Sequence, residues 1–358
     1  MPTVAEFITL LGTIAPFSKA AGWDPVGLQI GDPSAEVTRV AVCHEVTESV
    51  LAALDDQEEV DLVVAYHPLL FKETRSLVAS TRPAGRAFRL IRSGTALAVV
   101  HTAFDVASGG AADALAAELG LGDVRPFGPV WGADRVKVVT FVPEPFADDV
   151  ADAMAGAGAG SMGDYTACSF RVSGTGTFLP GPHASPALGE PGVFNREPEV
   201  RIEMVADPGR VEAVVAALVS AHPYEEPVID INDRRGDAGM IGRVGRLDST
   251  VDEVAALAAE RLGAVVRVAG SGPVESVAVV PGSGSAFIGA AAPIADVLVT
   301  GDVGHHRARD SVSRGLAVVD PGHAETERPG MRALYAAVSE MTDAIDLTAT
   351  DPTPWRGI

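Results

Sequence analysis

Two stretches of the chain alternate short apolar runs with amphipathic segments, and this alternation predicts strands that alternate with helices. The first stretch covers residues 39 to 122, and the second covers residues 274 to 323. In each stretch the predicted order is strand, helix, strand, helix, strand. Strands that are almost entirely apolar and alternate with helices are typical of a mainly parallel sheet with helices on both faces. The two stretches therefore predict a three-layer α/β domain.

The segment between these stretches follows a different pattern. From residue 131 to 238 the predicted order is strand, helix, strand, strand, helix, strand, which is typical of a small ferredoxin-like module. A stretch rich in Gly, Pro and Ser, from Gly174 to Gly192, predicts a long turn or loop inside this module. We therefore expect a discontinuous α/β domain, formed by residues 1–130 and 239–358, that is interrupted by an inserted α+β module.

Composition argues against several classes of protein. The 358 residues carry a formal net charge of -21, and such a charge opposes nucleic-acid binding because phosphate backbones are bound by clustered Lys and Arg. The two cysteines, Cys43 and Cys168, form no CxxC pair, which predicts a reducing compartment, the cytoplasm. No apolar run approaches the roughly 20 residues of a membrane helix, so we expect a soluble protein without a membrane partner.

Histidine and carboxylate residues gather where the predicted strands end. Six of the eight histidines lie within or just after a predicted strand: His44, His67, His101, His305, His306 and His323. Ligands bind beyond the carboxyl ends of the strands in an open parallel sheet, so we expect these side chains at one edge of one sheet. Imidazole and carboxylate without cysteine form the ligand set of an open Zn, Fe or Mn site. The sequence therefore predicts a metal site.

The segment GHAETE adds an argument from spacing. His323 and Glu327 are four residues apart, so a helix that begins after Gly322 would place them on one face, where they can bind one ion or two adjacent ions. Glu325 would point elsewhere, toward solvent. Asp24, in WDPVGLQIG, is a candidate acceptor for a hydrogen bond from a ligand. The alternative for each histidine is an ordinary hydrogen-bonded core residue.

The chain resembles a known family in five motifs. These motifs are, in order, WDPVGLQIG, AYHPLLF, HTAFDVASGG, TGDVGHH and PGHAETE, and they resemble those of the GTP cyclohydrolase 1 type 2 homologues, also called Nif-three-like proteins. The resemblance covers nearly the whole chain. VSAHPYEEPVIDI further resembles the inserted module of the longer members, which is similar to the small, trimer-forming CutA and PII-type fold. The resemblance implies a dinuclear metal site and a toroidal homohexamer whose sites face an internal cavity.

The resemblance also implies roles for individual residues. His67 stands for the second histidine of the family's HHP motif, Asp105 for the aspartate of its HTxxD motif, and His323 with Glu327 for its GHxxxE motif. Tyr66 stands where the first HHP histidine would be. We therefore expect one well-occupied ion held by His67, Asp105 and Glu327. A weaker second position would use His323, Glu327 and either Tyr66 or water.

Two further places depart from the family's pattern. His44 and Glu45 replace a more usual leucine–aspartate pair, and Ala112 stands where asparagine is usual. The resemblance gives no role to these three residues.

These predictions lead to a metal-dependent hydrolase. One or two divalent ions per chain would lower the pKa of water toward about 7 and supply hydroxide. In a GTP cyclohydrolase-like reaction the hydroxide would attack C8 of the purine, and His306 or His101 would serve as acid or base. A phosphoester or another nucleotide-derived small molecule fits the residues equally well. The alternative is a non-catalytic metal-binding scaffold or a small-molecule sensor.

Overall fold

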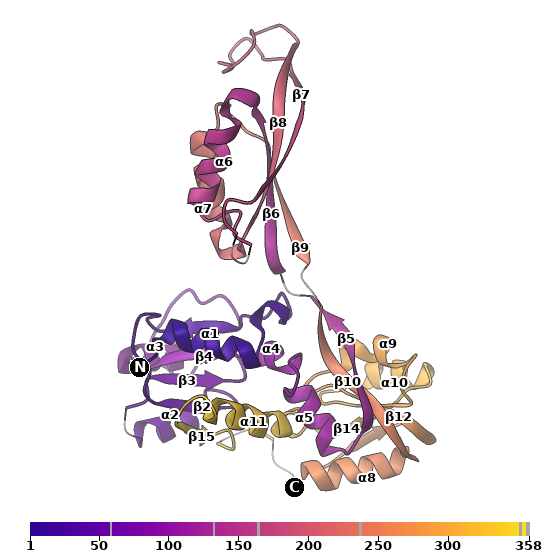
Figure 1. Ribbon diagram of the computed structural model, residues 1–358. Coiled ribbons are helices and arrows are strands. Elements are labelled where there is room, and N and C mark those ends of the chain that lie inside the picture. The colour runs from indigo at the N-terminus through magenta and orange to yellow at the C-terminus, as the bar shows by residue number, and fades with distance from the viewer. Residues whose placement is uncertain (58, 132, 163–164, 236–237, 351–352, 356–358) are drawn as a thin grey trace. The chain divides into compact units, whose positions relative to one another are not determined.

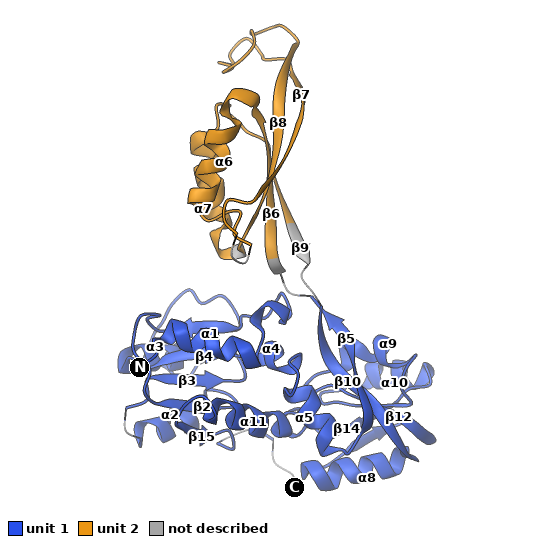
Figure 2. Cartoon of the chain, viewed as in Figure 1, with its two compact units in different colours: residues 1–132, 237–358 blue, residues 133–236 orange. Residues whose placement is uncertain are grey.

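The computed structural model describes residues 1–57, 59–131, 133–162, 165–235, 238–350 and 353–355, and the chain divides into two compact units (Figure 2). Unit 1 is formed by Met1–Gly132 together with Asp237–Ile358, and unit 2 is formed by Ala133–Gly236. These divisions lie close to the boundaries that the sequence predicts for the inserted module. None of the helices in the described ranges is both long and apolar enough to cross a membrane.

Unit 1 contains two mixed β-sheets, and the first has five strands (Figure 1). Across the sheet they are β1 (Gly27–Ile30), β4 (Ala96–Val99), β3 (Leu62–Ala65), β2 (Val40–Cys43) and β15 (Ala344–Leu347). The last four are parallel, and β1 pairs with β4 in antiparallel fashion at the edge. This sheet therefore follows the predicted, mainly parallel pattern.

Helices cover both faces of the first sheet. They are α1 (Val4–Ile14), α2 (Glu48–Asp55), α3 (Pro83–Ser93) and α11 (His323–Ser339). Successive residues of β2 point to opposite faces, so Val40 and Val42 share a core with α1 and α11, while Ala41 and Cys43 share a core with α2 and α3. Both faces are buried, which explains why the strands are apolar throughout.

The second sheet of unit 1 has six strands. Across the sheet they are β11 (Arg267–Ala269), β14 (Ala317–Asp320), β13 (Val297–Val299), β12 (Pro273–Val279), β10 (Gly239–Thr250) and β5 (Gly122–Val130). β12, β13 and β14 are parallel, and the other neighbouring pairs are antiparallel. The prediction of one mainly parallel sheet is therefore wrong. The two apolar stretches build two separate sheets, and the long strands β5 and β10 add an antiparallel pair to the second sheet.

Four helices accompany the second sheet. They are α5 (Ala111–Glu118), α8 (Val251–Leu262), α9 (Ile288–Ala291) and α10 (His305–Ser313), and the 3-10 turns of unit 1 are η1 (Phe17–Lys19) and η4 (Ser285–Phe287). α5 and α8 share a core with one face of β12 and β13, and α9 shares a core with the other face. Unit 1 is thus a mixed α/β structure, and this part of the fold prediction is confirmed.

The segment ALAVVHTAFD, predicted as one strand, is a strand followed by a helical turn. β4 ends at Val99, and α4 spans His101–Asp105. His101 has a φ of 27°, which no strand residue adopts. Oδ2 of Asp24 accepts hydrogen bonds from the backbone N–H of Thr102 at 3.0 Å and from its hydroxyl at 2.5 Å. This contact with a distant residue fixes the turn, and the composition of the segment does not reveal it.

Unit 2 combines a four-stranded antiparallel sheet with two helices. Along the chain its elements are β6 (Ala133–Pro143), η2 (Glu144–Phe146), α6 (Ala147–Gly156), β7 (Ser169–Phe178), β8 (Asn195–Ala206), η3 (Pro208–Arg210), α7 (Val211–Ala221) and β9 (Ile229–Arg235). The sheet order is β7-β8-β6-β9, and α6 and α7 share one buried core with it. The predicted loop from Gly174 to Gly192 is wrong in its first part, because β7 pairs with β8 as far as Phe178.

Candidate metal centre

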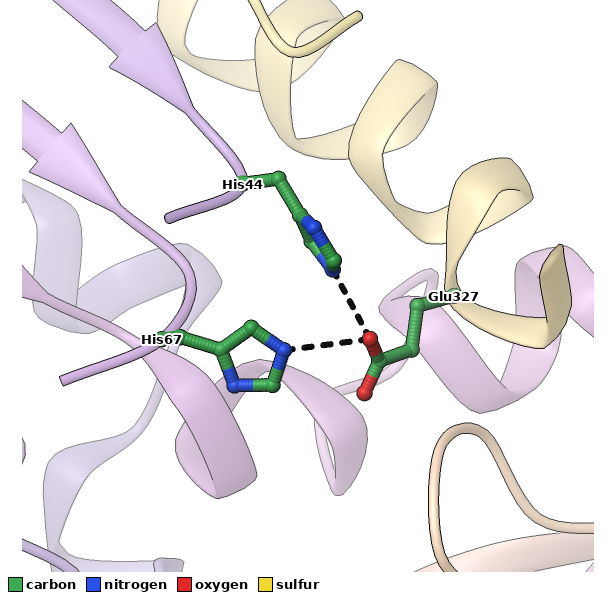
Figure 3. Close-up of side chains that lie close together, drawn as sticks. All are labelled: His44, His67 and Glu327. Carbon is green, nitrogen blue, oxygen red and sulfur yellow. Dashed lines mark hydrogen bonds and ion pairs between the residues drawn. The ribbon is translucent and has the colours of Figure 1, made fainter. Parts of the chain in front are cut away.

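Three side chains from distant parts of the sequence converge at one point in unit 1 (Figure 3). Nε2 of His44 lies 2.8 Å from Oε2 of Glu327, and Nε2 of His67 lies 3.1 Å from the same oxygen. One potential ligand atom of each residue lies within 4.8 Å of those of the other two. We refer to His44, His67 and Glu327 as the central cluster.

The register of the first sheet brings the two histidines together. β2 and β3 are parallel neighbours, and Cys43 at the end of β2 pairs with Ala65 at the end of β3. The pairing continues beyond the strands, since the backbone N–H of His67 donates to the carbonyl of His44 at 2.8 Å. The two imidazole rings meet edge to face, with their centroids 4.7 Å apart. Both imidazoles therefore lie at the carboxyl edge of the parallel strands, where ligands of such sheets bind.

The start of α11 supplies the carboxylate of the cluster. Gly322 has a φ of 107°, and the helix begins at His323. His323 and Glu327 share one face of the helix, as their spacing predicts, and Nε2 of His323 lies 3.1 Å from Oε1 of Glu327. The loop after β12 approaches the same carboxylate, because a Cβ at Gly282 would lie 2.4 Å from Oε1 of Glu327. This close approach, at a φ of 61°, requires glycine.

Burial and neighbouring rings set the protonation of the cluster. Glu327 is 2% exposed and His44 is 4% exposed. Burial opposes ionisation of Glu327, but His67, His323 and His44 outweigh burial and hold the pKa of this carboxyl well below its usual range. Burial lowers the pKa of His67 below its ordinary value, and Glu327 offsets only part of this effect. The cluster therefore pairs a carboxylate with a neutral imidazole near pH 7, and these are the forms that bind metal ions.

Two residues predicted as metal ligands, Tyr66 and Asp105, bind each other next to the cluster. The Tyr66 hydroxyl donates to Oδ1 of Asp105 at 2.5 Å, and both side chains are buried. Burial and the charge of Asp105 raise the pKa of Tyr66 well above its ordinary value, so the phenol keeps its proton. Burial also raises the pKa of Asp105 to about 7. Neither residue belongs to the central cluster, and their assignment as ligands stays a prediction.

His101, predicted as an acid or base, is oriented by a carboxylate. Its Nδ1 lies 2.9 Å from Oδ1 of Asp24, and this carboxylate also accepts the two bonds from Thr102. Burial lowers the pKa of His101, but the hydrogen bond and charge of Asp24 outweigh burial, so the net pKa is raised. Asp24 thus orients His101, and its predicted role as an acceptor behind a metal ligand stays a prediction. The ring of His101 lies 5.1 Å from that of His67 between centroids.

His323 is held in the same way on the other side of the cluster. Its Nδ1 lies 2.7 Å from Oδ2 of Asp302, while its Nε2 faces Glu327. Although burial lowers the pKa of His323, the bonds to Glu327 and Asp302 raise it to about 9. The imidazole is therefore protonated at neutral pH unless an ion displaces the proton.

The other predicted acid or base, His306, lies elsewhere. It is exposed at the start of α10, and its ring packs against that of His305 with a centroid distance of 5.3 Å. Within the described ranges no hydrogen bond or ring contact joins His306 to the central cluster. The catalytic role of His306 stays a prediction, and the structure does not bring this residue together with the others.

A cavity of about 440 Å³ opens onto the cluster. Its lining includes four imidazoles and two carboxylates, those of His44, His67, His101, His323, Glu45 and Asp302. This volume lies in the range of small-molecule sites. The oriented histidines His101 and His323 and the two histidines of the cluster therefore face the same space, which is large enough for a substrate.

His44 is the cluster residue to which sequence reasoning gave no role. It belongs to the six histidines at strand ends, but the ligand prediction followed the family's motifs, in which His44 is only a departure. The signal that could have identified it is the pair VAVCHE and VVAYHP, two apolar strands that each carry a histidine just beyond the end. If those strands are parallel neighbours, their histidines must meet.

Comparison with known proteins gives consistent matches over the whole chain. The model of the Duf34/NIF3 (NGG1p interacting factor 3) family matches residues 2–353. A Bacillus subtilis protein named GTP cyclohydrolase 1 type 2 homolog is 36% identical over 328 residues, which are 89% of this chain and 87% of that protein. A Mycobacterium tuberculosis protein of the same name is 38% identical over 340 residues, which are 91% of this chain and 88% of that protein.

Solved structures agree with these matches. A Bacillus cereus protein described as related to NIF3 is 31% identical and superimposes with a TM-score of 0.64, covering 100% of this chain and 99% of that chain. The described fold is thus shared along the full length of that relative.

Proposed function

This chain belongs to the Duf34/NIF3 (NGG1p interacting factor 3) family, and from that premise we propose that it is a metal-dependent hydrolase that acts on a nucleotide or a related small molecule. The observation that carries the proposal is the convergence of His44, His67 and Glu327. The name shared by the relatives, GTP cyclohydrolase 1 type 2 homolog, makes GTP the first substrate to test.

The donors of the central cluster fit a divalent ion of the Zn, Fe or Mn type. Two imidazoles and one carboxylate are a ligand set that leaves positions open for water and substrate. Nδ1 of His44 is buried and has no hydrogen-bond partner among the described residues, so the one described hydrogen bond that orients this ring, beside its ring contacts with Tyr66 and His67, is that of Nε2 with Glu327. An ion bound by His44, His67 and Glu327 would take over that orienting role.

A second ion position is supported by the other carboxylate oxygen. Oε2 of Glu327 faces His44 and His67, whereas Oε1 faces His323, so the carboxylate can serve ions on both sides. We propose one or two ions per chain, with His323 at the second position. Asp105 and Tyr66 remain proposed ligands, and the hydrogen bond between them must break before either can bind an ion.

A divalent ion at this point would supply hydroxide as the nucleophile near neutral pH. His101 would move the proton of the reaction. Its Nδ1–H is held by Asp24, so its Nε2 is left to accept or donate a second proton. Its raised pKa favours the protonated, acidic form. His306, which lies apart, is the second proposed acid or base.

The charge of the cavity supports an anionic substrate. His101 and His323 both line it, and both have raised pKa values. The raised pKa of His101 favours its charged form, which attracts phosphate or another anion, whereas His323 would be neutral at the second ion position, where the ion itself would carry positive charge. Any nucleotide is such an anion, so this argument does not single out guanine.

The experiment combines metal analysis with product analysis. Purified protein is loaded with Zn, Fe or Mn, and its metal content is measured by inductively coupled plasma mass spectrometry. It is then incubated with GTP and with a panel of other nucleotides and phosphoesters. We expect one compound of the panel to be consumed by the loaded protein and not by the Glu327→Gln variant. A loaded protein that consumes none of them contradicts the hydrolase proposal.

A metal-binding scaffold or sensor without catalysis is the second candidate. The burial of Glu327 and His44 favours it, because a deeply buried ion is held firmly even when no reaction follows. Thermal-shift screening of metabolites distinguishes the two candidates. A ligand that stabilises the protein and is recovered unchanged supports a sensor, whereas a ligand that disappears with time supports an enzyme.

We further propose that the protein is a cytoplasmic homohexamer that binds neither nucleic acid nor membranes. The net charge of -21 supports the absence of a nucleic-acid partner. The βαββαβ order of unit 2 and its sheet order β7-β8-β6-β9 support a ferredoxin-like module of the trimer-forming type. Light scattering at micromolar concentration should give the mass of six chains, and the mass of one chain contradicts the proposal.

A further inference from the structure

Unit 2 contains a cavity of about 640 Å³ whose lining shares no residue with the metal centre. Three aromatic rings and three carboxylates line it, those of Phe141, Phe178, Tyr224, Glu199, Glu225 and Glu226. The volume lies in the range of sites for small molecules. The cavity includes residues of HPYEEP, a motif that the proposed hydrolase reaction does not use.

The cavity lies on the face of the unit 2 sheet that α6 and α7 leave open. Val200 and Ile202 of β8 belong to the core beneath these helices. Successive strand residues point to opposite faces, so Glu199 lies on the open face. The chain after β7 closes the cavity there, since the backbone N–H of Ser185 donates to Oε2 of Glu225 at 3.3 Å.

A buried histidine fixes the turn that carries Tyr224, Glu225 and Glu226 of the lining. Nδ1 of His222 accepts from the backbone N–H of Tyr224 at 3.1 Å, and Nε2 therefore donates to the carbonyl of Phe141 at 3.0 Å. Burial lowers the pKa of His222, which keeps the ring in this neutral form. The ring of Tyr224 and the carboxylates that follow it are thereby positioned against β6.

Glu199 is held as a charged acceptor with one oxygen free. The Tyr224 hydroxyl donates to Oε1 of Glu199 at 2.6 Å, and burial together with this bond raises the pKa of Tyr224 well above its ordinary value. Within the described part of the chain, Oε2 of Glu199 has no hydrogen-bond donor. Gly176 on β7 makes room for the carboxylate, because a Cβ there would lie 2.2 Å from Cδ of Glu199. The strand is thus shaped around this side chain.

The lining lacks a positive charge that could balance these carboxylates. Its described residues include no Lys, Arg or His. The guanidinium of Arg201 lies 5.4 Å from the centroid of Phe141, but Arg201 pairs with Glu203 at 2.8 Å and lies outside the lining. Aromatic faces attract cations, and carboxylates bind ammonium groups through charge-assisted hydrogen bonds.

We propose that this cavity binds a small organic cation, an ammonium group carried on an apolar body. The ammonium group donates to Oε2 of Glu199, and the apolar body lies against the rings of Phe141 and Phe178. Glu225 and Glu226, which are exposed at the cavity, add attraction at its rim. The site is independent of the metal centre, so it stands or falls separately from the proposed hydrolase function.

The test is calorimetric titration of the full chain with phenethylamine and, separately, with spermidine at constant ionic strength. Phenethyl alcohol, which has the shape of phenethylamine without its charge, is the neutral control ligand. Glu199→Gln keeps an acceptor for Tyr224 but removes the charge. It should weaken binding at least about tenfold, as expected for loss of a charge-assisted bond. Glu212→Gln is the matched control, since Glu212 is exposed on α7 of the same unit and does not line the cavity.

Binding of either amine that is weakened by Glu199→Gln and unchanged by Glu212→Gln supports the proposal. Equal binding of phenethyl alcohol overturns it, because the cavity would then recognise apolar shape alone. Equal weakening by both variants also overturns it, as this would reflect only attraction to an acidic protein. A dissociation constant above about 1 mM for both amines overturns it as well. If Glu199→Gln does not fold by circular dichroism, Glu199→Ala, which also removes the charge, replaces it with the same expected direction.

Discussion

Glu327 in unit 1 and Glu199 in unit 2 are both carboxylates fixed by neighbouring side chains, but their neighbours differ in kind. Three imidazoles surround Glu327, which is 2% exposed. A single phenol holds Glu199, beside aromatic rings and without a basic residue in the described lining. Imidazole is itself a metal ligand, whereas aromatic faces attract organic cations. We infer that the neighbours of a carboxylate, more than its burial, determine which cation it binds.

The largest effect is expected from Glu327→Gln in unit 1. The amide keeps the size of the side chain but removes its charge and one ligand. Loss of an outer hydrogen-bond partner alone costs about 10–100-fold in metal affinity, so loss of this ligand should cost about 100-fold or more. Competition titration against a chelating dye measures the change. Glu325→Gln on the same helix is the control, since Glu325 contacts Arg328 and not the cluster. Unchanged affinity in Glu327→Gln would show that the cluster is only a hydrogen-bonded core.

The next effect is expected from Tyr66→Phe. Removal of the hydroxyl leaves buried Asp105 without its donor, and we expect a loss of about 1–3 kcal/mol in the free energy of unfolding. Urea denaturation of metal-free protein measures this loss. Zn²⁺ affinity should stay within about twofold if Tyr66 is not a ligand. A large drop in affinity would instead support the role as a ligand that the sequence predicts for Tyr66.

A smaller effect is expected from Gly282→Ala. A Cβ at this position meets Oε1 of Glu327 at 2.4 Å, and a φ of 61° costs an L-residue about 1–2 kcal/mol. Both the free energy of unfolding and the metal affinity should fall. Gly289→Ala in α9 is the matched control, because nothing lies within 4 Å of a Cβ there and its φ is ordinary. Equal stability of the two variants contradicts the close approach at Gly282.

The smallest effect is a pH dependence of opposite sign in the two units of the metal-free protein. The pKa of His323 is raised to about 9, so its contribution to stability is complete below about pH 6.5 and is lost as the pH rises toward 9. The pKa of His222 is lowered, so the unfolded chain takes up the proton first and unit 2 loses stability as the pH falls below about 6.5. Urea denaturation between pH 5 and 9 measures these changes. The loss of stability above about pH 6.5 should be absent from His323→Gln, and the loss below about pH 6.5 should be absent from His222→Gln. If a variant keeps the pH dependence that we assign to its substituted histidine, that assignment is contradicted.

The alternation of apolar runs with amphipathic segments predicted much of the fold. The strands around His44, His67 and His101 are apolar because helices bury both faces of their sheet, and such runs are visible in the sequence. The division into two sheets was not predictable, because periodicity does not specify which strands pair over a long sequence separation. The helical turn at His101 was missed for a similar reason, since Asp24 fixes it from a distant loop.

The candidate site shows the same limit. His67, His323 and Glu327 follow from strand ends and from helical spacing, and they meet in the structure. Asp105 and Tyr66 were assigned to the metal by resemblance, but a hydrogen bond joins them to each other. His44 was missed because its meeting with His67 depends on the parallel register of β2 and β3, which periodicity does not specify.

The central claim is that His44 completes a metal site with His67 and Glu327. The most direct measurement is competition titration of Zn²⁺ into wild-type protein and into His44→Leu, with His306→Leu as the control. Leucine fills a similar space without offering a ligand. We predict that His44→Leu weakens Zn²⁺ binding about 100-fold or more, since loss of an outer partner alone costs about 10–100-fold, while His306→Leu leaves it unchanged. Equal affinity of the wild type and His44→Leu would contradict the account, because His44 would then be a core histidine beside a metal that it does not bind.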